Sequence, residues 1–122
     1  MLHIEIDSND FATLCDFVEQ QSITLTVVGP EAPLVDGIVD YFSARNLKCF
    51  GPSAKAAQLE GSKSFTKDFL ARHKIPTADY QTFTDQAQAL AYLKEKQAPI
   101  VIKADGLAAG KGVIVAMTME EA

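Results

Sequence analysis

Basic residues, cysteines and long apolar runs are scarce in this sequence of 122 residues, and each scarcity argues against a class of protein. The chain has 11 basic and 16 acidic residues and a net charge of −5, which gives no electrostatic reason to expect nucleic-acid binding. Its two cysteines, Cys15 and Cys49, match no metal-ligand spacing and are expected to be reduced core thiols. No stretch resembles a signal peptide or a membrane span. These features predict a cytoplasmic protein with no nucleic-acid or membrane partner.

The composition that remains, 48% hydrophobic and 22% charged, fits a globular α/β protein with one sizeable core. In the first half, strand-like apolar stretches alternate with stripes at helical spacing. The strands are expected at residues 2–6, 23–28 and 48–50. The first helix is expected after a cap at Ser8 or Asn9, and the second over an apolar stripe from Leu34 to Phe42. This β-α-β-α-β order is typical of a parallel sheet with helices on its faces.

The second half is expected to be mainly helical up to a final hairpin. Ser62 and Thr84 are expected to cap two helices, and residues 80–83 to form a short strand between them. Thr118 is expected to cap another helix. The change from strand-rich alternation to helices places the domain boundary between residues 51 and 61.

The most informative segment is residues 99–116, PIVIKADGLAAGKGVIVA, in which a glycine-rich loop joins two strand-like runs. Lys103 ends an otherwise apolar strand, where we expect a cation to need an anionic partner. The loop GLAAGKG, residues 106–112, can bring backbone N–H groups close to a bulky anion, and Lys111 adds a mobile charge. The segment predicts a β-hairpin whose tip could close over a triphosphate. The alternative, judged from the segment alone, is an ordinary hairpin with a solvated tip.

The loop does not match a P-loop, although both are rich in glycine and carry a lysine. Only three residues separate Gly106 from Gly110, and Gly112 stands where a P-loop has serine or threonine. The β-branched run that follows favours a returning strand rather than a helix.

Lys63 and Lys67 lie one turn apart in the first half of the helix that begins after Ser62. Cations are disfavoured near a helix N-terminus, so a bound anion would gain from both lysines and from the helix dipole. The alternative is a solvated basic face.

Three motifs in the same order resemble the glycinamide ribonucleotide synthetase family of the ATP-grasp superfamily. They are VGPEAPLVDGIVD at residues 28–40, the run at 50–80 that contains KAAQLEGSKSFTKDF, and the hairpin at 99–117. The resemblance implies an α/β fold: a partial Rossmann-like parallel sheet, then the first part of an ATP-grasp domain with its glycine-loop hairpin. It places residues 1–60 in the C-terminal part of the N-terminal Rossmann-like substrate domain, and 61–122 at the start of the ATP-grasp domain, including its first lid hairpin.

The resemblance implies an ATP-dependent carbon–nitrogen ligase of de novo purine biosynthesis. Such an enzyme joins 5-phospho-β-D-ribosylamine to glycine through a glycyl phosphate, cleaves ATP to ADP and phosphate, and uses Mg²⁺ or Mn²⁺. Phosphoryl transfer of this kind needs positioned cations and backbone donors more than a covalent nucleophile.

The resemblance also implies which residues bind ligands. The positions that match the family's ATP-binding motifs are Lys63, Lys103, Gly106, Leu107, Ala108, Ala109, Gly110, Lys111 and Gly112. The turn Gly29-Pro30-Glu31 matches the motif for the ribosylamine substrate, although Glu31 could instead cap the following helix. No catalytic residue and no metal ligand is assigned within the chain, which is expected to be a fragment that is inactive alone.

Two alternatives stay open. The chain could come from another ATP-grasp carboxylate ligase, such as a biotin-carboxylase-like enzyme, although the run at residues 55–69 is not expected there. It could also be a non-catalytic nucleotide-binding or structural fragment.

Overall fold

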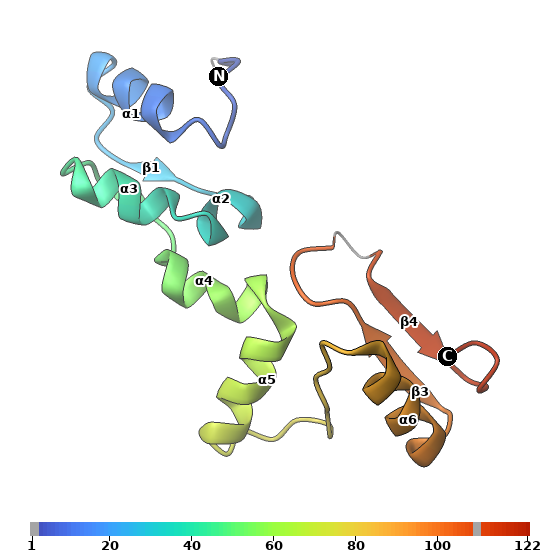
Figure 1. Cartoon of the computed structure of the whole chain (residues 1–122). Coiled ribbons are helices and arrows are strands. Elements are labelled where there is room, and N and C mark those ends of the chain that lie inside the picture. Colours follow the sequence, from blue (N-terminus) through green and yellow to red (C-terminus); the bar gives the residue numbers. More distant parts are fainter. Residues whose placement is uncertain (1–2, 109–110) are drawn as a thin grey trace. The chain divides into compact units, whose positions relative to one another are not determined.

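The computed structural model describes residues 3–108 and 111–122. The chain divides into two compact units, an N-terminal unit (Met1–Gly61) and a C-terminal unit (Ser62–Ala122), each of which is described by itself (Figure 1). Among the described residues, every helix is too short or too polar to cross a membrane.

The N-terminal unit is a short parallel β-pair with four helices. Its elements are α1 (Phe11–Gln20), β1 (Thr26–Val27), α2 (Glu31–Val35), α3 (Ile38–Ala44), β2 (Cys49–Phe50) and α4 (Ala54–Gly61). In the parallel ladder Thr26 lies opposite Cys49 and Val27 opposite Phe50. The parallel pairing confirms the α/β expectation for this half.

The core of the N-terminal unit lies between α1 and α3. Cys15 and Val18 of α1 are three positions apart and Ile38 and Phe42 of α3 are four positions apart, so that each buried pair shares one face of its helix. Cys49 packs against this cluster, and burial raises the pKa of both thiols. Both cysteines are free thiols.

Two expectations for this unit are wrong. Residues 3–6 form no strand, because a strand needs a neighbour for its backbone hydrogen bonds and Ile6 N–H instead turns back to Ile4 O (3.2 Å). The single helix expected from Leu34 to Phe42 is two helices. Gly37, with φ of +95°, ends the first of them, and the left-handed conformation interrupts the helical ladder there.

The cap of α1 also differs by one or two positions from the expectation. Asp10, and not Ser8 or Asn9, accepts the N–H of Thr13 (3.1 Å). That hydrogen bond lowers the pKa of Asp10. A carboxylate suits this place because it also meets the positive end of the helix dipole.

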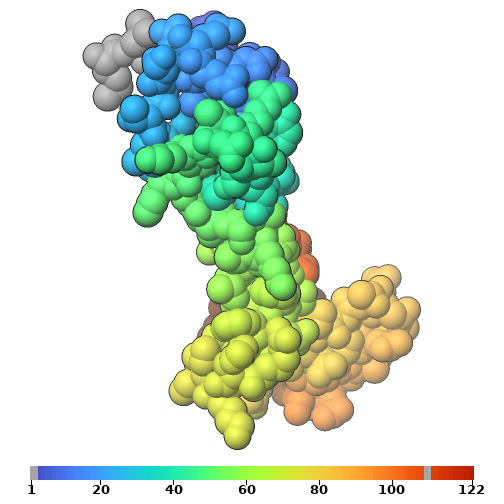
Figure 2. Space-filling view, turned by 90° about the vertical axis from the view of Figure 1, so that its left-hand side faces the viewer, coloured from blue at the N-terminus to red at the C-terminus, as the bar shows by residue number. Residues whose placement is uncertain are grey.

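The C-terminal unit consists of two helices and a hairpin: α5 (Lys63–Arg72), α6 (Gln86–Lys96), β3 (Ile100–Lys103) and β4 (Val113–Ala116). The strands are antiparallel, with Ile100 opposite Ala116 and Lys103 opposite Val113, which confirms the predicted hairpin. Ser62 caps α5, as expected, by accepting the N–H of Phe65. None of the side chains of α5 is fully buried, and its yellow-green atoms lie at the surface in Figure 2.

Three local expectations fail in the C-terminal unit. Residues 80–83 form no strand, because no described strand pairs with their backbone. Side-chain contacts hold this segment instead: Tyr80 donates its hydroxyl to Asp68 (2.6 Å), and the ring of Phe83 packs on that of Tyr92. The cap of α6 is Asp85 rather than Thr84. Turns follow Thr118 where a helix was expected.

Candidate functional site

The carboxylate of Asp105 links the segment after β3 to the first turn of α5. Oδ1 of Asp105 accepts the backbone N–H of Lys63 (2.6 Å) and of Ser64 (3.2 Å). Oδ2 accepts the hydroxyl of Ser64 (2.6 Å) and that of Ser62 (3.0 Å). These partners stand 41 to 43 residues from Asp105 along the chain, so the bonds fix a tertiary contact and not a local turn.

The hydrogen-bond donors around Asp105 hold it in its ionised form. Ser62 and Ser64 each carry a single hydroxyl proton, and both protons can point to the carboxylate while Ser62 Oγ accepts the N–H of Phe65. The Ser64 hydroxyl bond is the largest cause that holds the pKa of Asp105 well below its usual range, and backbone N–H groups and the Ser62 hydroxyl add to it against desolvation. Asp105 is therefore an anion at neutral pH, with its lone pairs occupied by protein donors.

Lys63 reaches the same segment through its side chain. Its Nζ donates to the backbone carbonyl of Gly106 (2.7 Å). A carbonyl is neutral, and within the described part of the chain Lys63 has no carboxylate partner. The ammonium group is thus placed at the start of the glycine-rich loop with its charge uncompensated.

Two loop glycines are explained by the geometry at the base of the loop. Gly106 has φ of +88°, which side-chain-bearing residues rarely adopt. Gly112 accepts the N–H of Ala104 (2.7 Å), and a Cβ at Gly112 would stand 2.8 Å from that of Ala108. Ala109 and Gly110 of the predicted ATP-binding set lie outside the described residues.

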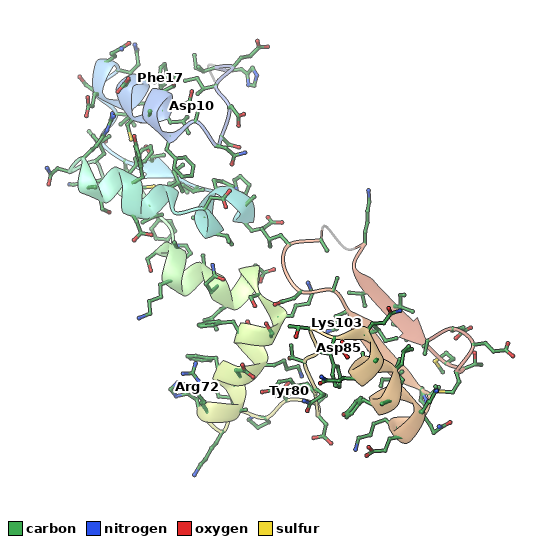
Figure 3. The ribbon with its side chains drawn as sticks, viewed as in Figure 1. Asp10, Phe17, Arg72, Tyr80, Asp85 and Lys103 are labelled. Atoms are coloured by element: carbon green, nitrogen blue, oxygen red, sulfur yellow. The ribbon has the colours of Figure 1, made fainter. Side chains whose placement is uncertain are left out.

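Lys103, Leu107 and Lys111 are exposed (Figure 3 labels Lys103). For Lys103 this corrects the reasoning behind the prediction: the side chain at the end of β3 stays hydrated and does not need an anion to offset burial. Neither lysine has an ion-pair partner among the described residues. Both are accessible to a ligand, and their role in binding ATP stays a prediction.

Lys67 does not join Lys63. Its Nζ donates to Thr77 Oγ1 (2.7 Å) and to the carbonyl of Ala78 (2.9 Å), and it lies 5.6 Å from the ring centre of Tyr80. The ammonium group ties the segment after α5 to that helix, so Lys67 has a structural role instead of forming a solvated basic face or an anion site.

The turn Gly29-Pro30-Glu31 follows the end of β1 after one intervening residue, at the carboxyl end of the parallel pair. All of its residues are exposed, and Glu31 is the first residue of α2. No side-chain cap bond forms at the start of α2, which argues against the capping alternative, although an acidic residue in the first turn suits the helix dipole. The assignment of this turn to the ribosylamine stays a prediction.

Sequence reasoning missed Asp105 and Ser64. The sequence patterns predict Ser62 only as a helix cap and assign no role to Asp105 or Ser64. A signal was present: a carboxylate directly before a predicted phosphate loop would repel phosphate unless other groups of the protein offset its charge. No cluster of three or more potential metal ligands occurs among the residues that the structure describes.

A solved structure shares this fold. It is the biotin carboxylase domain of 2-oxoglutarate carboxylase from Hydrogenobacter thermophilus, in a complex with MgADP, ADP and bicarbonate. The match has a TM-score of 0.76 and 20% identity, and it covers 99% of this chain and 28% of that one. At this identity the likeness concerns the fold.

Residues 61–122 match the family described as phosphoribosylglycinamide synthetase, ATP-grasp (A) domain, so the fold and the lysine–glycine hairpin belong to the ATP-grasp class. Residues 2–60 match the N domain of the same synthetase. The chain belongs to the phosphoribosylglycinamide synthetase family, and the resemblance inferred from the motifs is confirmed.

Relatives called phosphoribosylamine–glycine ligase are similar along nearly the whole chain. The protein of Escherichia coli (strain K12) is 70% identical over 120 residues, and that of Pseudomonas syringae pv. tomato is 69% identical over 120 residues. The Haemophilus influenzae protein is 64% identical over 120 residues. Each match covers 98% of this chain and 28% of the relative, so the chain spans about a quarter of the length of these relatives.

Proposed function

We propose that this chain functions as part of a phosphoribosylamine–glycine ligase of de novo purine biosynthesis. Such a ligase forms glycinamide ribonucleotide from 5-phospho-β-D-ribosylamine and glycine with ATP. The observation that supports it best is the 70% identity over 98% of the chain to a relative of that name. The two consecutive family matches, to the N domain and to the ATP-grasp domain, support the same assignment.

The residues at the hairpin fit the phosphates of ATP. Lys63 presents an ammonium group bonded to a neutral carbonyl, and Lys103 and Lys111 are exposed cations, the first before the loop and the second within it. Asp105 would oppose a phosphate, but its oxygens are taken up by hydroxyl and backbone donors. A polyanion at the loop would therefore meet lysine cations and backbone N–H groups, and the carboxylate of Asp105 would compete little with it for them.

In the proposed reaction these residues bind and orient rather than react covalently. Lys63 and Lys103 would hold the phosphates, and the loop would exclude water as it closes. Bound ATP supplies the phosphoryl group that activates the glycine carboxylate. A divalent ion, Mg²⁺ or Mn²⁺, would be held outside the residues assigned here. Gly29, Pro30 and Glu31 are the candidates for contact with the ribosylamine.

The test uses a full-length chimera, defined as the Escherichia coli relative with its matched segment replaced by this chain. ADP release is measured with Mg-ATP, glycine and ribosylamine generated in place. We expect release that requires both glycine and ribosylamine. The isolated chain of 122 residues is expected to release none and serves as the comparison. Release that needs bicarbonate and not glycine would favour another ATP-grasp ligase, and no release would contradict the proposal.

A further inference from the structure

We propose that Asp105 is a positioning residue: its carboxylate anchors the base of the glycine-rich loop to α5 and leaves the ammonium group of Lys63 without an anionic partner, ready for phosphate. The part that concerns phosphate rests on the proposed function. The anchoring itself concerns only contacts within the C-terminal unit.

The anchor acts at the point where the loop leaves β3. Asp105 directly precedes Gly106, the first loop glycine, and its oxygens are bound by the backbone and side chains at residues 62–64. Lys63 adds a second tie to the same point through the Gly106 carbonyl. The described bonds at the other side of the loop base are those of Ala104 with Gly112 and of Lys111 with Ala108. Asp105 and Lys63 thus tie this hairpin to α5 with side chains of opposite charge, and Asp105 makes the larger number of bonds.

The arrangement also separates charges. Asp105 accepts hydrogen bonds from the N–H groups of Lys63 and Ser64 in the first turn of α5. Without Asp105 these N–H groups would be open to an external anion. Because those groups and the two hydroxyls saturate the carboxylate, it does not pair with the Lys63 ammonium group, which bonds a neutral carbonyl instead. An incoming phosphate is directed to the lysine side chains and not to the helix end.

Removal of the charge should loosen the loop. A hydrogen bond to an ionised group is worth more than one between neutral groups, and its loss shifts an opening equilibrium by about tenfold. In Asp105→Asn the amide keeps the size of the side chain but lacks its charge, and its NH₂ group replaces one of the two oxygens that accept these hydrogen bonds.

The first measurement uses the full-length chimera without nucleotide, so that it does not depend on activity. Trypsin cleavage after Lys111 is compared between the chimera, Asp105→Asn and the control Asp85→Asn. Asp85 is also a helix cap in the C-terminal unit (Figure 3) and accepts the N–H of Gln88 at 2.9 Å, but none of its described bonds reaches the loop. We expect cleavage about tenfold faster in Asp105→Asn and unchanged in Asp85→Asn. Equal rates for Asp105→Asn and the parent chimera would overturn the proposal.

The second measurement separates positioning from a general loss of structure. For Asp105→Asn we expect the KM for ATP to rise about tenfold while kcat stays within about threefold, because a looser loop costs ordering entropy on binding. A fall in kcat with unchanged KM would indicate a smaller folded fraction and would contradict positioning.

Ser64 provides the test if Asp105→Asn fails to fold. Ser64→Ala removes one hydroxyl donor and leaves the Asp105 charge in place, whereas Ser64→Thr keeps a hydroxyl. We expect faster cleavage after Lys111 in Ser64→Ala and a rate near that of the parent in Ser64→Thr. Identical rates for both variants would count against the anchor. An inactive parent chimera would reject the proposed function, and the cleavage rates would still decide the anchor.

Discussion

The contacts that stabilise the inside of the N-terminal unit differ in kind from those inside the C-terminal unit. The N-terminal unit has an apolar core of Cys15, Val18, Ile38 and Phe42 between two helices. Within the described part of the C-terminal unit, Ala116 is the only fully buried hydrophobic residue. Large side chains of β4 are exposed, and that of Val115 is 62% exposed. Among its described side-chain hydrogen bonds that join residues more than 40 positions apart, all involve Asp105 except that of Lys63 with Gly106.

The difference shows which part of the chain can change shape. Apolar packing is lost only when a core opens, whereas a loop held by a few charged hydrogen bonds can open by itself. The proposed ATP site lies in the unit that has the fewer buried side chains. Substitutions in each unit can test this contrast.

Phe42→Ala should destabilise the N-terminal unit by about 3–5 kcal/mol, because the ring is completely buried and its removal leaves a cavity. Hydrogen exchange of the amides of α1 and α3 in the chain of 122 residues measures the loss. Tyr41→Ala is the matched control, since Tyr41 is the adjacent aromatic residue and is 38% exposed. Equal losses of stability for the two variants would show that the buried ring of Phe42 contributes no more than the exposed ring of Tyr41, and would contradict the role of the apolar core.

Lys103→Ala and Lys63→Ala in the full-length chimera should each lower kcat/KM for ATP about 30- to 100-fold, because removal of a cation from a phosphate site costs about 2–3 kcal/mol. Steady-state kinetics measures the effect. Lys94→Ala, at an exposed position near the end of α6, should leave the kinetics unchanged. If all three variants behaved alike, general surface charge and not a site would explain the result.

The contribution of Asp105 to loop order should depend on pH in one direction. Its pKa is depressed in the folded state, so the contribution is complete above the ordinary value of about 3.9 and is lost as the pH falls below it. Hydrogen exchange of the loop in the chimera and in Asp105→Asn should differ by about tenfold from pH 8 to pH 5, and the difference should shrink below about pH 4. A difference that disappears near pH 6 would point to another titrating group.

Arg45→Ala should have the smallest effect. Arg45 pairs with Asp16 at 2.7 Å, but both side chains are exposed to water, where an ion pair is screened and contributes little. We expect a melting temperature within about 2 °C of the parent chain, with an even smaller shift in about 0.5 M salt. A larger loss would mean that surface charge, and not only the core, holds the N-terminal unit together.

Elements with a strong local signal were predicted from the sequence. The hairpin follows from two β-branched runs around a glycine-rich loop, and the Ser62 cap follows from a serine directly before a helical apolar pattern. The parallel pair was located within a few residues, although its strands are shorter than expected. The break at Gly37 was missed because the apolar stripe continues across it.

The family, the α/β order and the lysines and glycines of the proposed ATP site could be predicted from residue type and spacing along the chain. The folded structure was needed to see which groups Asp105 binds and which of Lys63 and Lys67 lies at the base of the loop. Lys67 is bound to the segment after α5, while Lys63 reaches the loop base. The physical reason is that a charged side chain acts through the groups it meets. Asp105 meets partners 41 to 43 residues away, a distance over which local pattern carries no information.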